Sequence, residues 1–253
     1  MVAAHFLASA SVLFASVALA GPLEHRTTGA QHSRLFQGTS QSNITNTYYN
    51  SAWAGAAWSD QPPGTFTSVT GTFTVPTPTG SNGSSTAWVG IDGYSCQTAL
   101  LQTGIDFTIS GGQVSYSTWL EWVPAAQVSY DSASDISFFG GDSVTLTVTA
   151  TSATTGIATI ENNTSGQKVT QEISSSSPLC QQDAEWIVED YSVNGAPVIL
   201  DDFGTVTFTA ASASMSNGTS IGPGGAGLVD IQQNGQNLTL SSTSYSGVTI
   251  QYL

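Results

Sequence analysis

The sequence has very little positive charge. Its 253 residues include only three Lys and Arg and three His, against 17 Asp and Glu, and the formal net charge at pH 7 is −14. All of the basic residues except Lys168 precede residue 35. The phosphate backbone of a nucleic acid would repel so acidic a chain. We therefore expect no nucleic-acid partner.

The scarcity of histidine excludes several kinds of catalysis. From residue 35 onward the chain has no histidine, so neither a Ser–His nor a Cys–His pair can form there. Histidine is equally missing as a zinc ligand, and no glycine-rich loop with a phosphate-binding lysine occurs. We expect neither a metal nor a cofactor. Carboxylate chemistry, or no chemistry at all, is what remains.

The N-terminus has the pattern of a secretory signal peptide. An apolar run over residues 6–20 ends in Ala-Leu-Ala before Gly21. This pattern predicts a signal peptide at residues 1–20 and a secreted, extracellular protein, the alternative being a buried N-terminal helix. No later run is apolar enough to span a bilayer, so we expect no membrane partner. Six sequons are glycosylation candidates: Asn43, Asn82, Asn162, Asn163, Asn217 and Asn237.

Cysteine is also rare. The two cysteines, Cys96 and Cys180, form an even set in a chain predicted to be exported, and this predicts one disulfide. The bridge would close a long loop, which stabilises a fold by about 4–5 kcal/mol in the chain-entropy model.

What the chain has in abundance is alternation of apolar and polar residues. In SVTLTVTA, residues 143–150, the apolar side chains all fall on one face, and Val206, Phe208 and Ala210 repeat the pattern. Alternation with period two, punctuated by Gly and Pro turns, predicts half-buried antiparallel strands. We expect residues 48–253 to form one all-β domain, an antiparallel β-sandwich of two large sheets of the jelly-roll or concanavalin-like kind, and a monomer.

Residues 21–47 differ from the rest of the exported chain. The stretch is polar, does not alternate and holds His25, Arg26, His32 and Arg34. It is interpreted as a pro-segment or a disordered arm. Our hypothesis is that its basic residues dock on an acidic cleft and keep the protein inactive at neutral pH.

The segment AEWIVED, residues 184–190, places three carboxylates in an apolar run. On a strand, Glu185, Ile187 and Glu189 would share one face, and Trp186 and Val188 would pack inward between the sheets. The two glutamates would then lie about 13 Å apart, too far to share a proton. A catalytic partner must therefore come from another strand. On composition alone, an outer face in contact with solvent is where Glu is normally found.

Several stretches follow one another along the chain: WAGA from Trp53, TAWVGIDG from Thr86, CQTALLQTGIDF from Cys96, YSTWLEWVP from Tyr116 and AEWIVED from Ala184. In this order they resemble the glutamic peptidases of fungi, the eqolisins of peptidase family G1. The resemblance extends from about residue 50 to the C-terminus. It implies a sandwich of two antiparallel sheets and a disulfide at the two cysteines, in agreement with the residue patterns.

The resemblance also implies the site. The family's catalytic glutamine lies in its Leu-Gln-Thr-Gly motif and its catalytic glutamate is the second one of AEWIVED, which implies Gln102 and Glu189. The substrates would be proteins or peptides. Five further residues of the matched motifs are expected to line or support the cleft: Trp88, Asp92, Asp106, Trp119 and Glu121.

These two residue types suit peptide hydrolysis in acid. A glutamate with a pKa near ~4.3 can exchange protons efficiently in an acidic medium. A glutamine amide can donate a hydrogen bond to the developing oxyanion at any pH, and such a donor is typically worth about 3–4 kcal/mol of the barrier.

One alternative stays open from the residues alone. Two carboxylates and several tryptophans in a β-sandwich also describe a glycoside hydrolase or a lectin-like sugar-binding module. A retaining glycosidase needs two carboxyl groups about 5 Å apart, and Glu121 and Glu189 could meet across strands.

Overall fold

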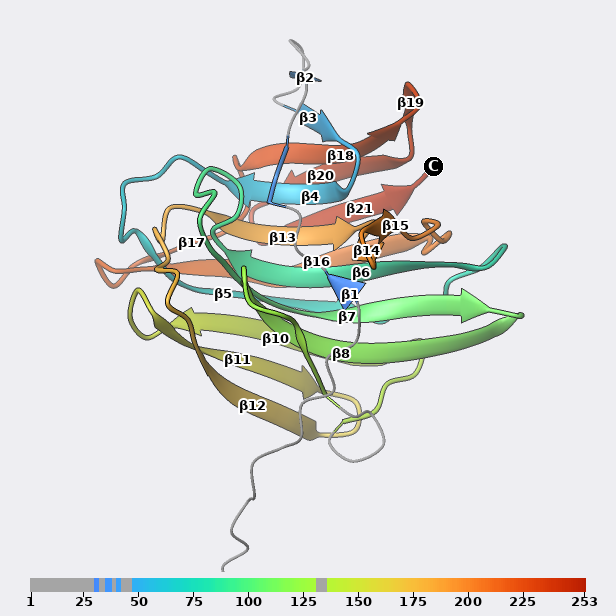
Figure 1. The fold of residues 1–253 in the computed structure, drawn as a ribbon, viewed down its shortest axis with the longest axis horizontal. Helices are drawn as coiled ribbons and strands as arrows, with labels where there is room; N and C mark the ends of the chain where they lie inside the picture. The colour runs from blue at the N-terminus through green and yellow to red at the C-terminus, as the bar shows by residue number, and fades with distance from the viewer. Residues whose placement is uncertain (1–29, 32–34, 38–39, 42–46, 131–135) are drawn as a thin grey trace, which may run out of the picture.

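The computed structural model describes residues 30–31, 35–37, 40–41, 47–130 and 136–253. Within these ranges the regular structure consists of strands, arranged in two large sheets and one small sheet (Figure 1). The described ranges contain no helix that could cross a membrane. The expected all-β class is confirmed.

The larger sheet has ten strands and is antiparallel except where β3 pairs with β18. Neighbouring strands along this sheet follow the order β2-β3-β18-β4-β13-β6-β7-β8-β9, and β19 pairs with β18 alone. Their bounds are Ser40–Gln41 (β2), Thr47–Asn50 (β3), Gly227–Gln233 (β18), Trp53–Trp58 (β4), Ala184–Glu189 (β13), Gly83–Ile91 (β6), Leu100–Ser110 (β7), Gln113–Val123 (β8), Val128–Tyr130 (β9) and Gln236–Asn237 (β19).

The second sheet has eight strands, in the order β12-β11-β10-β5-β16-β21-β20 with β17 paired to β16. Their bounds are Gln167–Ser174 (β12), Thr155–Asn162 (β11), Ser143–Ala150 (β10), Phe66–Thr74 (β5), Thr205–Met215 (β16), Gly247–Tyr252 (β21), Thr239–Ser244 (β20) and Ser220–Ile221 (β17). A three-stranded sheet, β1-β14-β15, joins Ala30–Gln31 to Ser192–Val193 and Ala196–Pro197.

The core lies between the two large sheets. Trp186 of β13 points into it, and its indole N–H donates to the Thr70 carbonyl of β5, in the opposite sheet, at 2.8 Å. The ring of Phe73, also on β5, packs against Phe107 of β7 and Phe208 of β16, with ring centroids 6.3 and 5.3 Å apart. The expected inward direction of Trp186 and the two-layer sandwich are therefore confirmed.

Alternation predicted the buried face of most strands, and one strand departs from it. On β10 every second residue, Val144 to Ala150, is buried, as expected. On β16, however, Ala210 is exposed and has a φ of +48°, while Ala211 and Ala213 are buried. The pairing of β16 with β5 shifts register between Thr209 and Ser212. This β-bulge adds a residue and reverses the faces beyond it, so the assignment of Ala210 to the core was wrong.

The N-terminal segment contacts the domain where the structure describes it. Ala30–Gln31 pairs with β14, and Ser40–Gln41 pairs with β3. The next described strand, β3, begins at Thr47. The predicted signal peptide and the basic residues of the segment, His25, Arg26, His32 and Arg34, lie outside the described residues.

The predicted disulfide is present. Cys96 and Cys180 are bridged, with their Cα atoms 6.0 Å apart and a sequence separation of 84 residues. We expect replacing both by alanine to lower the free energy of unfolding by about 4–5 kcal/mol, because the bridge restricts the unfolded chain. Urea unfolding of the two proteins under oxidising conditions measures the difference. Equal midpoints would contradict an entropic role for this bridge.

The six sequons differ in exposure. Asn82, Asn163, Asn217 and Asn237 are exposed. Asn162 is buried, and its amide donates to the Asp142 carboxylate and to a backbone carbonyl, both at 2.9 Å, so this side chain cannot carry a glycan in the folded protein. Its candidacy was wrong, because the sequon says nothing about burial. Asn43 lies outside the described residues.

Candidate active site

Strand register arranges the outer face of β13, β6, β7 and β8 in three rows of side chains. Residues paired across antiparallel strands point to the same face of a sheet. The pairings give a Glu189 row, a tryptophan row and a Gln102 row. In strand order they consist of Glu189, Thr86, Asp106 and Ser117; of Ile187, Trp88, Gly104 and Trp119; and of Glu185, Gly90, Gln102 and Glu121.

The tryptophan row depends on a glycine. A Cβ atom at Gly104 would lie 2.6 Å from Cζ2 of Trp119 and 2.8 Å from Cβ of Trp88, closer than real contacts allow. Glycine therefore lets both indoles lie against the strand between them. Each indole N–H then reaches a carboxylate, Trp88 that of Glu189 at 2.8 Å and Trp119 that of Asp106 at 2.8 Å.

Glu189 is fully buried, and its carboxyl group is fixed from one side. Its Oε2 accepts the hydrogen bond from Trp88, whereas no described group hydrogen-bonds Oε1. Burial raises the pKa of Glu189 well above its usual range, the charges of Glu121 and Asp190 add to this, and the Trp88 hydrogen bond partly offsets it. The expectation of a solvent-facing carboxylate was wrong, because this face of the sheet is covered.

Gln102 and Glu121 form a buried pair on the neighbouring strands β7 and β8. They are register partners, and Nε2 of Gln102 donates to Oε2 of Glu121 at 3.0 Å. This contact holds one hydrogen of the Gln102 amide and so fixes the plane of the amide. The register places Gln102, Glu121 and Glu189 on one face, with the tryptophan row between the Gln102 row and the Glu189 row, and the charge of Glu121 also raises the pKa of Glu189.

Asp106 and Asp190 both accept hydrogen bonds from neighbouring side chains. Asp106 accepts hydrogen bonds from Trp119 and from the Ser117 hydroxyl, at 2.8 and 3.0 Å. Asp190 follows the end of β13, and its carboxylate accepts from the Gln233 amide at 2.6 Å. Asp190 thus ties the chain just past the end of β13 to β18, and Asp106, within β7, fixes the Trp119 indole.

Asp92 and Asp183 join two loops reciprocally. The Asp92 carboxylate accepts the backbone N–H groups of residues 181 and 182, both at 2.8 Å. Asp183 in turn accepts those of Tyr94, Ser95 and Cys96, at 3.2, 2.7 and 2.9 Å. Asp92 thus supports the site from behind. Asp183 was missed, although its place between Cys180 and AEWIVED was a signal that it would meet the loop of the other cysteine.

Glu185 is a second buried glutamate with a different environment. Neither of its carboxyl oxygens hydrogen-bonds a described residue, and a Cβ at Gly90 would lie 3.3 Å from its Oε2. Burial raises its pKa well above the usual range, and the charges of Asp183 and Asp92 add to the effect. The side chain therefore lies over Gly90 in an environment that favours the protonated form, in the same row as Gln102.

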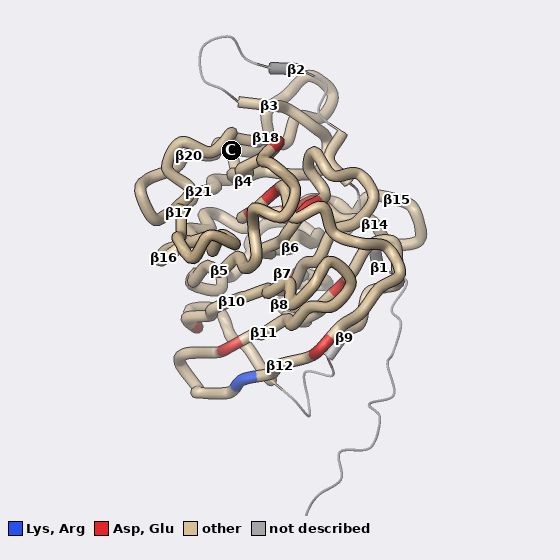
Figure 2. The backbone as a smooth tube through the Cα atoms, turned by 90° about the vertical axis from the view of Figure 1, so that its left-hand side faces the viewer, with Lys and Arg blue, Asp and Glu red and all other residues tan. Residues whose placement is uncertain are grey.

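Counter-charges are far from these carboxyl groups. Lys168 is the basic residue of the described part of the chain, and it lies on β12 of the opposite sheet, 3.2 Å from the Glu161 carboxylate (Figure 2). Figure 2 shows several acidic positions in the middle of the fold, away from this lysine. Potential metal ligands gather once in the described ranges, at Asp92, Cys96 and Cys180, and both of those sulfur atoms belong to the disulfide.

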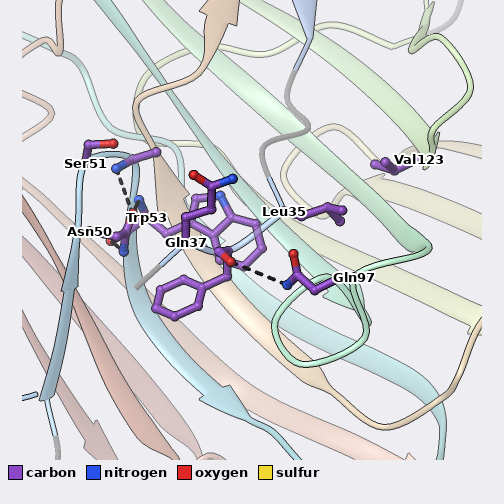
Figure 3. A pocket seen from close by; sticks show the side chains of 9 residues that line it. Leu35, Gln37, Asn50, Ser51, Trp53, Gln97 and Val123 are labelled. Atoms are coloured by element: carbon purple, nitrogen blue, oxygen red, sulfur yellow. Dashed lines mark hydrogen bonds between the residues drawn. The ribbon is translucent and has the colours of Figure 1, made fainter. Parts of the chain in front are cut away.

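The N-terminal segment closes the site. Leu35 and Phe36 pack against the apolar cluster that contains Trp53 and Trp88. A cavity of about 490 Å³ remains beside them, and Figure 3 shows Leu35, Gln37, Trp53, Gln97 and Val123 around it. The lining consists of residues 35–37 and 50–53 with Gln97 and Val123.

This face of the β-sandwich thus gathers buried carboxyl groups and a buried carboxamide, which are groups that can exchange protons and donate hydrogen bonds. Comparison with known proteins identifies the family. Residues 51–252 match the model of the Peptidase A4 family, and the chain belongs to this family. It is a glutamic peptidase, an enzyme that hydrolyses peptide bonds, and this removes the carbohydrate-active alternative.

Relatives and solved structures agree with this assignment. The chain is 42% identical to aspergillopepsin-2 of Aspergillus niger over an alignment 279 positions long, which covers 95% of this chain and 96% of that protein. It is 40% identical to scytalidopepsin B of Scytalidium lignicola, covering 84% and 82%. A scytalido-glutamic peptidase solved with a peptide-based transition-state analogue superposes with a TM-score of 0.71 and 37% identity, covering 81% of this chain and 99% of that one.

Proposed function

We propose that the protein is a secreted acid endopeptidase in which Glu189 activates the attacking water and Gln102 stabilises the oxyanion. The observation that carries the proposal is that a neighbouring side chain holds each of the two groups in place through a hydrogen bond. Trp88 holds one oxygen of Glu189, and Glu121 holds one hydrogen of the Gln102 amide, on the same buried face. A peptidase of this family with a peptide-based transition-state analogue supports such a site.

Glu189 has the geometry of a general base. The Trp88 N–H sets the orientation of the carboxyl group through Oε2, and Oε1 can then accept a proton from water. After the attack, the same oxygen can return the proton to the leaving nitrogen. The chain offers no histidine for this task from residue 35 onward.

Gln102 supplies the hydrogen bond that the developing oxyanion needs. Its amide nitrogen has two hydrogens, and the Glu121 bond uses one of them. When substrate binds, an N–H of this amide can donate to the substrate oxygen as negative charge develops on it. Because the amide is neutral, it can do so at any pH at which the peptidase works.

The protonation state of Glu189 depends on whether the N-terminal segment covers the cleft. Burial is the largest cause of its raised pKa, so covering the carboxyl group disfavours the ionised form that acts as a base. When the N-terminal segment leaves and water enters, the desolvation falls and the pKa moves back toward the ordinary range near ~4.3. Removal of the segment would therefore produce the ionised base that acid catalysis requires. This supports residues 21–47 as a pro-segment and the chain as a zymogen.

Gln102→Ala tests the proposed oxyanion role. We expect kcat/KM for a peptide substrate at acid pH to fall by about 100-fold or more, because one preorganised donor is lost. Gln251→Ala, which removes an exposed glutamine on β21 of the opposite sheet, is the matched control and should leave kcat/KM unchanged. A Gln102→Ala protein that turns over its substrate within a few-fold of the unaltered one would rule out this role.

A further inference from the structure

Phe36 is held by both of its backbone polar groups. Its N–H donates to the Gly93 carbonyl at 2.9 Å, and its carbonyl accepts from Nε2 of Gln97 at 3.4 Å. The same Gln97 amide also donates to the carbonyls of Gly93 and Tyr94, at 3.2 and 2.7 Å, which fixes its position in the loop. These contacts recognise a peptide backbone and make no use of the identity of the residue.

The side chain of Phe36 lies in a binding position formed by the rings of Tyr94 and Trp53, called the seat below. Its ring stacks on Tyr94, with ring centroids 3.9 Å apart and planes at 11°, and it meets Trp53 at 5.9 Å and 44°. Tyr48 supports Tyr94 from the side, edge to face at 6.2 Å. Aromatic pairs in these arrangements add to the stabilisation that burial already gives. The seat therefore favours an aromatic side chain over a small one.

The loop that carries the seat is rigidly held. Asp183 accepts the backbone N–H groups of Tyr94, Ser95 and Cys96, and Cys96 is bridged to Cys180. A seat fixed in this way selects its ligand by shape, because the loop loses little freedom when a peptide binds.

The seat adjoins the catalytic face. Trp53 is the register partner of Glu189 on the neighbouring strand, and its ring packs edge to face on Trp88 at 4.8 Å. Trp88 donates the hydrogen bond that orients Glu189. A peptide residue in the seat is thus one tryptophan away from the proposed base, close enough to belong to the same substrate as the bond that is cleaved.

We propose that Gly93, Tyr94, Gln97 and Trp53 form a substrate subsite for an aromatic residue of an extended peptide, which Phe36 occupies in the full chain. The inference rests on the proposed peptidase function for its meaning and on the Phe36 contacts for its geometry. It makes two statements that can be measured separately. Phe36 anchors the N-terminal segment, and the opened enzyme selects substrates with an aromatic side chain near the cleaved bond.

The first measurement is hydrogen–deuterium exchange and does not depend on activity. The host is the full chain with Glu189→Gln, which prevents self-cleavage. We expect Phe36→Ala and Tyr94→Ala each to speed exchange over residues 35–37 by about tenfold or more, because the anchoring stack is lost. Tyr94→Phe keeps the ring and should change exchange less than about twofold. Phe139→Ala, at a phenylalanine that is 70% exposed, is the control for losing a phenyl ring elsewhere.

The second measurement uses chain activated in acid and a set of fluorogenic peptides that carry one Phe, moved position by position along an alanine background. We expect one position near the cleaved bond to prefer Phe over Ala by about 10- to 100-fold in kcat/KM. Tyr94→Ala should reduce that ratio to about threefold or less, whereas Tyr94→Phe should preserve it.

The outcomes separate the subsite from the proposed function. If Phe36→Ala leaves exchange over residues 35–37 unchanged, or if an active enzyme has no aromatic preference that depends on the Tyr94 ring, the subsite is wrong. If the unaltered enzyme cleaves none of the peptides, nor casein at acid pH, the proposed function fails, and the exchange measurement alone decides whether the seat exists.

Discussion

Replacing Glu189 by glutamine is expected to lower kcat/KM by about 10⁴-fold, the upper end of what a general base contributes. Glutamine has nearly the same volume, and its carbonyl oxygen can still accept the hydrogen bond from Trp88. What it cannot do is take a proton from water and return it to the leaving amine. The loss therefore falls on the chemical step, and we expect it in kcat rather than in KM.

The comparison that makes this result interpretable is a matched loss of charge elsewhere. Glu161→Gln removes an exposed carboxylate on β11, paired with Lys168, and should leave both constants unchanged. Thermal unfolding at pH 4 should show that Glu189→Gln is folded, because burial already favours the neutral form of this carboxyl group and the amide has nearly the same volume. Turnover near the unaltered rate by a folded Glu189→Gln protein would remove Glu189 from the mechanism.

The face of each residue in AEWIVED could be predicted, but not what covers that face. Period-two alternation placed Glu185 and Glu189 together and Trp186 toward the core, and the structure agrees. Their burial depends on residues far away in the sequence, among them Trp53 and Phe36. No local pattern contains that information, so solvent was the natural expectation for two glutamates.

The hydrogen-bond partners of the site residues could not be predicted from local sequence patterns either. Gln102 lies on a strand as an ordinary polar residue would, and it was singled out only because its motif resembles that of a known family. Its hydrogen bond to Glu121 follows from the register of β7 and β8, which is set across the whole hairpin. Asp183 has no motif of its own, and its function in holding the loop of Tyr94 requires the fold.

The covered, acidic interior also determines how stability should depend on pH. We expect the free energy of unfolding of the full chain to fall as pH rises from about 4 to about 7, the reverse of the usual behaviour of acidic side chains in salt bridges. Burial raises the pKa of Asp92, Asp201 and Asp230 from 3.8 to about 6. Glu185 and Glu189 are shifted in the same direction, also mainly by burial.

The sign follows from proton binding. A carboxyl group whose pKa is higher in the folded state holds its proton more tightly there than in the unfolded chain. Its contribution to stability is complete below the unfolded value of 3.8 and is lost as pH rises through about 6. A shift of about two units corresponds to about 3 kcal/mol per group. Three such groups together approach the whole stability of a typical domain, about 5–15 kcal/mol.

Urea unfolding at pH 4, 5, 6 and 7 measures this loss, and Asp230→Asn tests one group within it. Asp230 is buried, and its carboxylate accepts hydrogen bonds from Thr239 and Ser241 at 3.1 and 2.8 Å. An asparagine keeps an acceptor there but cannot ionise. Between pH 5 and 7 the free energy of unfolding should therefore fall by about 1–3 kcal/mol less in the variant than in the unaltered chain. Because no basic group of the described chain other than Lys168 can compensate the charges that form, the fall should be steep. A midpoint that climbs from pH 4 to pH 7 would show that these carboxyl groups are already ionised in the folded protein.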